Sequence, residues 1–133
     1  MFKLFQRHSP QYNLFMSARR GDIRVARRIL DSGFEVDALD GSGRTALCLA
    51  AKYGQAGFIQ LLVERGANIN FVLKDGRTPL YFAIHSGDTG VVEALVKLGA
   101  DLNVQDGAGY TPHDYAAARS LTEMLEILKT GPE

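Results

Sequence analysis

The sequence predicts an all-α repeat solenoid of about four helix-turn-helix units, because one pattern recurs every 33 residues. The third unit shows it most fully, opening with Gly76-Arg77-Thr78-Pro79-Leu80. Moved back by 33 residues, this opening falls on Gly43-Arg44-Thr45-Ala46-Leu47, and moved forward it falls on Gly109-Tyr110-Thr111-Pro112. A fixed period of this length indicates a stack of identical helical units.

Each unit carries the signals of two short helices. Thr78-Pro79 is a helix start, since the Thr hydroxyl can accept from a free backbone N–H and Pro suits the first helical position. Gly87 suits the left-handed residue after that helix, and Asp88 is placed to cap a second one. Helices this short are marginal alone in water, so neighbouring units must bury their apolar faces in one continuous core. The apolar stripe expected in this second helix is Val91, Val92, Leu95 and Val96.

The first and last units are expected to cap the stack. Ser9-Pro10 supplies the first start signal, but the Thr-Pro-Leu motif is absent there, and Ser120 replaces the turn glycine of the last unit. Terminal repeats are atypical because one of their faces meets water. In the second unit, helices are expected over residues 46–53 and 56–65. The predicted division is an N-terminal arm (1–9), the repeat units 10–39, 40–72, 73–105 and 106–130, and a tail (131–133). The chain is expected to be loose from Thr130 onwards.

Arg77-Thr78-Pro79-Leu80, followed by Ala83, Gly87 and residues 99–103, resembles the ankyrin repeat, and the resemblance covers roughly residues 10–130. It implies an L-shaped stack of helix pairs with projecting β-hairpin fingers. It also implies a concave groove of fingers and inner helices that binds other proteins. The turn-forming run Asp40-Gly41-Ser42-Gly43 suits a finger tip.

One position departs from the family pattern in every unit that can be compared. Where the family commonly has His after Thr-Pro-Leu, this chain has Cys48, Tyr81 and Asp114. The polar network between repeats is therefore expected to differ.

Charge is balanced overall but unevenly distributed. The formal net charge is zero, yet residues 1–30 hold seven Lys or Arg against Asp22, and residues 100–133 hold six acids against Arg119 and Lys129. This asymmetry can orient a partner. The single cysteine excludes an internal disulfide and fits a reducing, cytoplasmic location. The apolar part of Met1 to Ser9 is too short for a secretory signal or a membrane span; it is expected to be a capping arm, or alternatively a membrane-touching or partner-docking one.

No residue pattern indicates catalysis or a cofactor. No Cys/His pair has metal-ligand spacing, and Cys48 is expected to pack as a small apolar residue. Gly41-Ser42-Gly43 lacks the Lys of a phosphate-binding loop. His85 is expected on the surface, with a pH-sensitive contact as the alternative. We therefore predict a non-enzyme without cofactors or metals.

The resemblance also implies which residues face a partner: the finger tips and the late positions of the inner helices. Most charged members of this set are basic, and Arg and Tyr are frequent interface anchors. The hypothesis is an acidic protein partner whose apolar side chain lies near Val72 and Leu73, bound by a stoichiometric inhibitor or adaptor. Solvated charges without a partner, binding of nucleic acid or anionic lipid, and weak head-to-tail self-association remain alternatives. The predicted partner-binding residues are Arg19, Arg20, Leu39, Arg44, Lys52, Tyr53, Val72, Leu73, Lys74, Arg77, His85, Tyr110 and Arg119.

Overall fold

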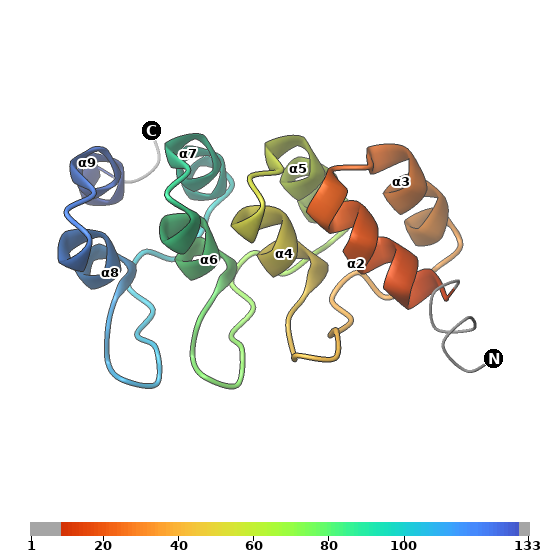
Figure 1. Cartoon of the computed structure of the whole chain (residues 1–133), viewed down its shortest axis with the longest axis horizontal. Coiled ribbons are helices and arrows are strands. Elements are labelled where there is room, and N and C mark those ends of the chain that lie inside the picture. The colour runs from red at the N-terminus through yellow and green to blue at the C-terminus, as the bar shows by residue number, and fades with distance from the viewer. Residues whose placement is uncertain (1–8, 131–133) are drawn as a thin grey trace.

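The computed structural model describes residues 9–130, and their regular secondary structure is entirely helical. The helices form two layers, an inner one of α2, α4, α6 and α8 and an outer one of α3, α5, α7 and α9, joined by loops that project on one side (Figure 1). The bounds are α2 Pro10–Arg20, α3 Ile23–Asp31, α4 Ala46–Lys52, α5 Ala56–Glu64, α6 Pro79–Ser86, α7 Thr89–Lys97, α8 Pro112–Ala118 and α9 Thr122–Thr130.

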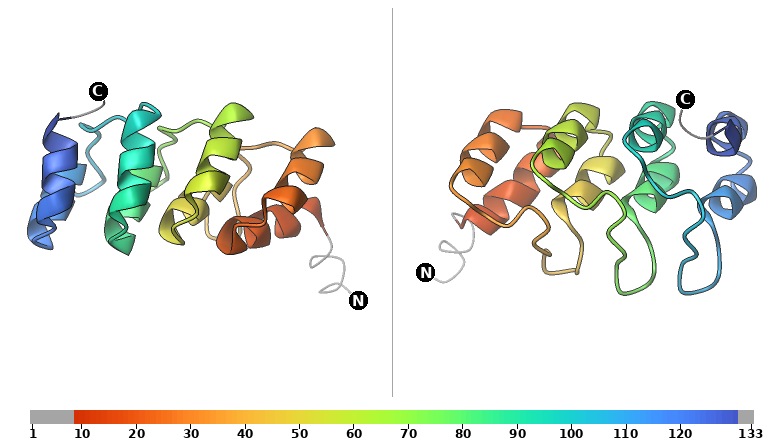
Figure 2. Two further views of the ribbon diagram at one scale, coloured as in Figure 1. Left: turned by 90° about the horizontal axis from the view of Figure 1, so that it is seen from above. Right: turned by 180° about the vertical axis from the view of Figure 1, so that it is seen from behind.

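The core runs along the whole stack. Each inner helix contacts its own outer helix and the inner helices beside it, and the outer helices contact one another in sequence (Figure 2). The most deeply buried side chains come from every pair of helices, from Leu14 and Phe58 through Leu95 to Met124. Each unit thus buries its apolar face against its neighbours. The stacked helix pairs and their continuous core confirm the predicted α-helical repeat solenoid.

Most of the predicted helix starts are capped as expected, and one is not. The hydroxyls of Ser9, Thr45 and Thr111 accept from backbone N–H groups of the first turn, as does the carboxylate of Asp88. Thr78 does not, although it precedes a proline like Thr111: its hydroxyl is buried without a hydrogen-bond partner. The capping role predicted for Thr78 is therefore wrong.

Three loops project from the inner layer, and we call them fingers two (residues 36–45), three (69–78) and four (102–111). No strand occurs in residues 9–130, so the β-hairpin form of the fingers is not confirmed. Each tip is instead closed by two backbone hydrogen bonds, one across five residues and one across four, the latter from Gly43, Gly76 or Gly109 back to the first residue of the tip. The five-residue bonds are the longer closures. The donor and acceptor pairs are Asp40 N–H to Arg44 O (2.8 Å), Leu73 N–H to Arg77 O (2.8 Å) and Asp106 N–H to Tyr110 O (2.9 Å).

The position that departs from the family pattern holds Cys48, Tyr81 or Asp114, and each of these side chains makes a different contact. The Cys48 sulfur accepts from the hydroxyl of Thr45 within its own unit. The Tyr81 hydroxyl lies against the carbonyl oxygens of Val104 and Tyr110 in finger four, and so ties unit three to unit four. Burial raises the pKa of Tyr81 to about 12.

In unit four, the capping box formed by Asp114 and Thr111 replaces any link to a further unit. The carboxylate of Asp114 accepts from the backbone N–H of Thr111, which lowers its pKa.

The ends of three helices differ from the expected ones. Thr130 belongs to α9 and not to a loose tail, and α4 and α5 each end one residue earlier than expected. Ser9 is the N-cap of α2, as the start signal Ser9-Pro10 predicts, although the predicted arm included this residue. The rest of the predicted arm and residues 131–133 lie outside the described part of the chain.

Candidate functional site

The exposed side of the inner helices and the three fingers together form one surface, which we call the groove face. Apart from the buried Leu73, the predicted partner-binding residues lie on it. Their surroundings differ, and this decides which of them could contact a partner. Some cations are exposed on it, some are bound to carboxylates of the same finger, and one binds backbone carbonyls.

Three cations lie at the C-terminal ends of α2 and α4: Arg19 and Arg20, which are exposed, and Lys52, which is half-buried. The Arg19 guanidinium lies 5.1 Å and the Lys52 amine 5.6 Å from the centre of the Tyr53 ring. A cation beside an aromatic ring is stabilised by the negative face of the ring without being neutralised. Arg20 is exposed at the end of α2. We call Arg19, Lys52 and Tyr53 the Tyr53 cluster.

Two arginines of the fingers are neutralised by their own loops. The Arg44 side chain pairs with Asp40 at 3.4 Å, and the Arg77 side chain pairs with Asp75 at 2.7 Å. Arg77 also lies 4.5 Å from the centre of the Phe82 ring. Burial acts to raise the pKa of Asp75, but the hydrogen bonds that Arg77 donates to this carboxylate outweigh burial, and the pKa is lowered. The basic character of the fingers is therefore weaker than a count of arginines suggests.

Arg119 has a structural role. Its guanidinium donates to the carbonyl of His85 and, at 3.4 Å, to that of Ile84. These carbonyls belong to the last turn of α6, where a cation is stabilised by the helix dipole. Gln55 performs the same task two junctions earlier, between units one and two, since its amide donates to the Arg19 carbonyl at the end of α2 (3.1 Å). The His85 side chain is exposed on the groove face.

The apolar prediction for the middle finger is half wrong. Val72 is 55% exposed, but Leu73 is 7% exposed and belongs to the core, so its side chain is not offered to a partner. Leu73 occupies the position of Asp40 and Asp106, whose carboxylates organise their own finger tips. Being apolar, it turns inward, and Asp75 takes over the contact with the Arg77 backbone N–H. Exposed apolar surface on the fingers comes from Leu39, Val72 and Tyr110.

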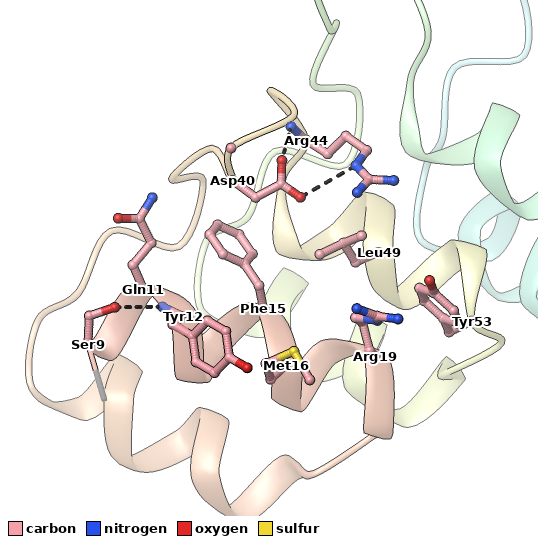
Figure 3. Close-up of a pocket in the computed structure, with 11 residues that line it drawn as sticks. Ser9, Gln11, Tyr12, Phe15, Met16, Arg19, Asp40, Arg44, Leu49 and Tyr53 are labelled. Atoms are coloured by element: carbon pink, nitrogen blue, oxygen red, sulfur yellow. Dashed lines mark hydrogen bonds and ion pairs between the residues drawn. The ribbon is translucent and has the colours of Figure 1, made fainter. Parts of the chain in front are cut away.

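A pocket opens beside the Tyr53 cluster, between α2, the tip of finger two and α4 (Figure 3). Its volume is about 430 Å³. Arg19, Arg44 and Tyr53 line it as predicted site residues. Sequence reasoning did not identify the other pocket-lining side chains of α2 and α4, which include Tyr12, Phe15, Met16 and Leu49. The signal that could have found them is the long first helix, α2, which has 11 residues against seven or eight in α4, α6 and α8.

The described residues hold no arrangement suited to catalysis by metal. Within residues 9–130 no three His, Cys, Asp or Glu lie close enough together to hold a metal ion. Burial raises the pKa of the Cys48 thiol, which disfavours a reactive thiolate. In the same range no helix combines the length and the apolar character needed to cross a lipid bilayer.

Comparison with known proteins agrees with the architecture. A family model described as ankyrin repeats in three copies matches residues 14–106 and 73–132. No curated protein matches the chain. The matched residues include all the helices described above except the start of α2, and they carry the recurring Thr-Pro start, the turn glycines and the paired helices. The chain belongs to the ankyrin repeat family.

Proposed function

We propose that this chain is a non-catalytic module that binds an acidic protein partner through its groove face and acts as a stoichiometric inhibitor or adaptor. Ankyrin repeats are generally protein–protein interaction modules. We infer the acidic character of the partner from the cations of the groove face. The Tyr53 cluster supports it most directly. Two cations converge on one half-exposed tyrosine there, and neither forms an ion pair with a carboxylate in residues 9–130. Lys74 adds an exposed charge on finger three.

The same observations favour a protein over a long polyanion. Arg44 and Arg77 are already paired, and Arg119 is bound to carbonyls, so few groove cations remain for successive phosphates. A nucleic acid or an anionic lipid surface needs many such contacts, and its binding falls steeply with salt. We expect no complex of the groove face with mixed oligonucleotides or anionic vesicles at low salt. We also expect a cytoplasmic location, which imaging of the tagged protein would check.

The test is a charge reversal with a matched control. The groove variant replaces Arg19 and Lys52 by Glu, and the control variant replaces Arg24 and Arg27, which are exposed on α3 of the outer layer. Both variants change the net charge equally. Tagged proteins are used to capture partners from source lysate, with circular dichroism to confirm folding.

We expect the wild type and the control to retain a common acidic protein and the groove variant to lose it. Retention by the groove variant would overturn the assignment to the groove face. Loss by the control alone would assign binding to the outer helices instead. Because exposed ion pairs are screened, the capture should also weaken as salt is raised.

A further inference from the structure

The pocket beside the Tyr53 cluster combines an apolar floor with a charged rim. Figure 3 shows the side chains of Phe15 and Leu49 between Arg19 at one end and the Asp40–Arg44 pair at the other. Phe15 is 8% and Leu49 2% exposed, so both belong to the core and present a fixed surface to the pocket. Such a floor can bury an apolar side chain without paying for reorganisation of the groove.

The rim adds aromatic surface that is still in contact with water. Tyr12 is 39% and Tyr53 41% exposed, and both line the pocket. Half-exposed tyrosines around a buried floor are frequent anchors of protein interfaces. The volume of about 430 Å³ lies in the range of pockets that hold one or two large side chains or a small ligand.

The charges of the pocket do not balance. Arg19 and Arg44 face one carboxylate, Asp40. That carboxylate is already engaged, since one oxygen accepts from the backbone N–H groups of Ser42 (2.8 Å) and Arg44 (2.9 Å) and the other pairs with the Arg44 side chain. The Nε of Arg44 makes this ion pair at 3.4 Å and is itself buried, so it is not available to a bound group. The pocket therefore has an apolar floor and one excess positive charge, at Arg19.

We propose that this pocket binds a large apolar side chain of the partner together with a carboxylate next to it. The apolar group would lie on Phe15 and Leu49, and the carboxylate would face Arg19. This inference rests on the proposed function, because it names the part of an acidic partner that the groove face recognises. A single carboxylate matches the single excess charge, whereas an uncharged apolar residue would leave Arg19 without a counterion, since Arg44 is already paired with Asp40.

A titration with two small probes tests the pocket without knowledge of the partner. N-acetylphenylalanine carries a phenyl ring and a carboxylate, and N-acetylphenylalaninamide carries the same ring without the charge. Each is added to the isotope-labelled full chain, and amide shifts are followed by NMR, which also reports whether every variant is folded. We expect both probes to shift amides of α2, finger two and α4, with the acid binding about fivefold more tightly, as for one partly exposed ion pair.

Two variants locate the charge. Arg19→Gln should remove the preference for the acid, while Arg24→Gln on α3 should leave it unchanged. Equal affinity of the two probes, or shifts spread over the outer helices, would overturn the proposal. So would shifts that depend on protein concentration, which would assign the pocket to a second copy. Shifts of the same amides on replacing Phe2 and Phe5 by Ser, without a probe, would assign it to the N-terminal arm.

The two failures can be told apart. If the probes do not bind but the Arg19 and Lys52 charge reversal still abolishes capture, the pocket inference is wrong and the groove function stands. If the acid probe binds as expected while capture survives that reversal, the pocket exists but does not serve the proposed partner, and the inference that it recognises this partner is wrong.

Discussion

The hydroxyl of Tyr81 provides the sharpest test of how the repeats are held together. Tyr81 is 1% exposed, and its hydroxyl lies against two carbonyl oxygens at the base of finger four. A hydroxyl has one proton, so it donates to one of the two carbonyls at a time. The change Tyr81→Phe removes this donor and keeps the ring, which packs edge-on against Tyr115 at 5.2 Å.

The expected cost follows from the surroundings of the two carbonyls. A net hydrogen bond contributes about 1 kcal/mol, and a buried acceptor left unpaired costs up to about 3 kcal/mol. Val104 is half-buried and Tyr110 exposed, so water reaches part of the site, and we expect a loss of about 1–2 kcal/mol of unfolding free energy. With an ordinary urea dependence, this moves the midpoint down by about 0.5–1 M.

The matched control deletes the same atom from an exposed tyrosine. Tyr110 is 56% exposed, so Tyr110→Phe should change the unfolding free energy by less than about 0.5 kcal/mol. Because neighbouring repeats support one another, Tyr81→Phe should also speed hydrogen exchange in α8 and α9 more than in α2 and α3. Equal urea midpoints for Tyr81→Phe and Tyr110→Phe would refute the view that this hydroxyl joins units three and four.

Three further predictions use matched pairs or pH. Burial raises the pKa of Tyr81 from 10.0 to about 12, so the native state keeps a proton that the unfolded state loses in this pH range. The free energy of unfolding should therefore fall as pH rises from 10.0 towards 12. Urea titrations on either side of pH 10.0 should show a smaller fall for Tyr81→Phe than for the wild type. Gly76→Ala should lower the melting temperature more than Gly43→Ala, because both glycines have positive φ but only a Cβ at Gly76 meets backbone, at 2.6 Å from the Gly107 nitrogen. Thr78→Val should be neutral or stabilising in urea titrations, because the Thr78 hydroxyl has no partner, whereas Thr45→Val should cost about 1 kcal/mol by removing the cap on Cys48.

The fold could be predicted almost completely because its determinants are local and repeated. The helix starts, the turn glycines and the apolar stripes lie within a few residues of one another, and the 33-residue period repeats them. The failure at Thr78 shows the limit. Thr78 and Thr111 both precede proline, but the residue two positions after the proline is Tyr81 in one unit and Asp114 in the other, and only the aspartate completes a capping box.

The site was less predictable because its chemistry depends on distances between side chains. Asp40 and Arg44 are four residues apart, but the rules for such pairs hold on helices, and this pair lies in a loop. The Arg119 guanidinium donates to the carbonyl of His85, 34 residues away along the chain, and no pattern of residue types reveals this contact. Phe15 and Leu49 are core residues that also form the floor of a pocket, and such a double role cannot be read from residue types without coordinates.

The fingers also differ in how they could respond to a partner. The Gly107 N–H donates to the Asp75 carbonyl at 2.8 Å and so joins the tips of fingers three and four, while no such bond joins fingers two and three in residues 9–130. A partner that orders finger three would therefore order finger four as well. Binding to finger four would then cost less conformational entropy of that finger. Contacts on these two fingers should be positively cooperative, whereas contacts on finger two should add independently. If so, the groove face would act as two binding elements, and affinity for the C-terminal element could change without altering the recognition proposed for the N-terminal pocket.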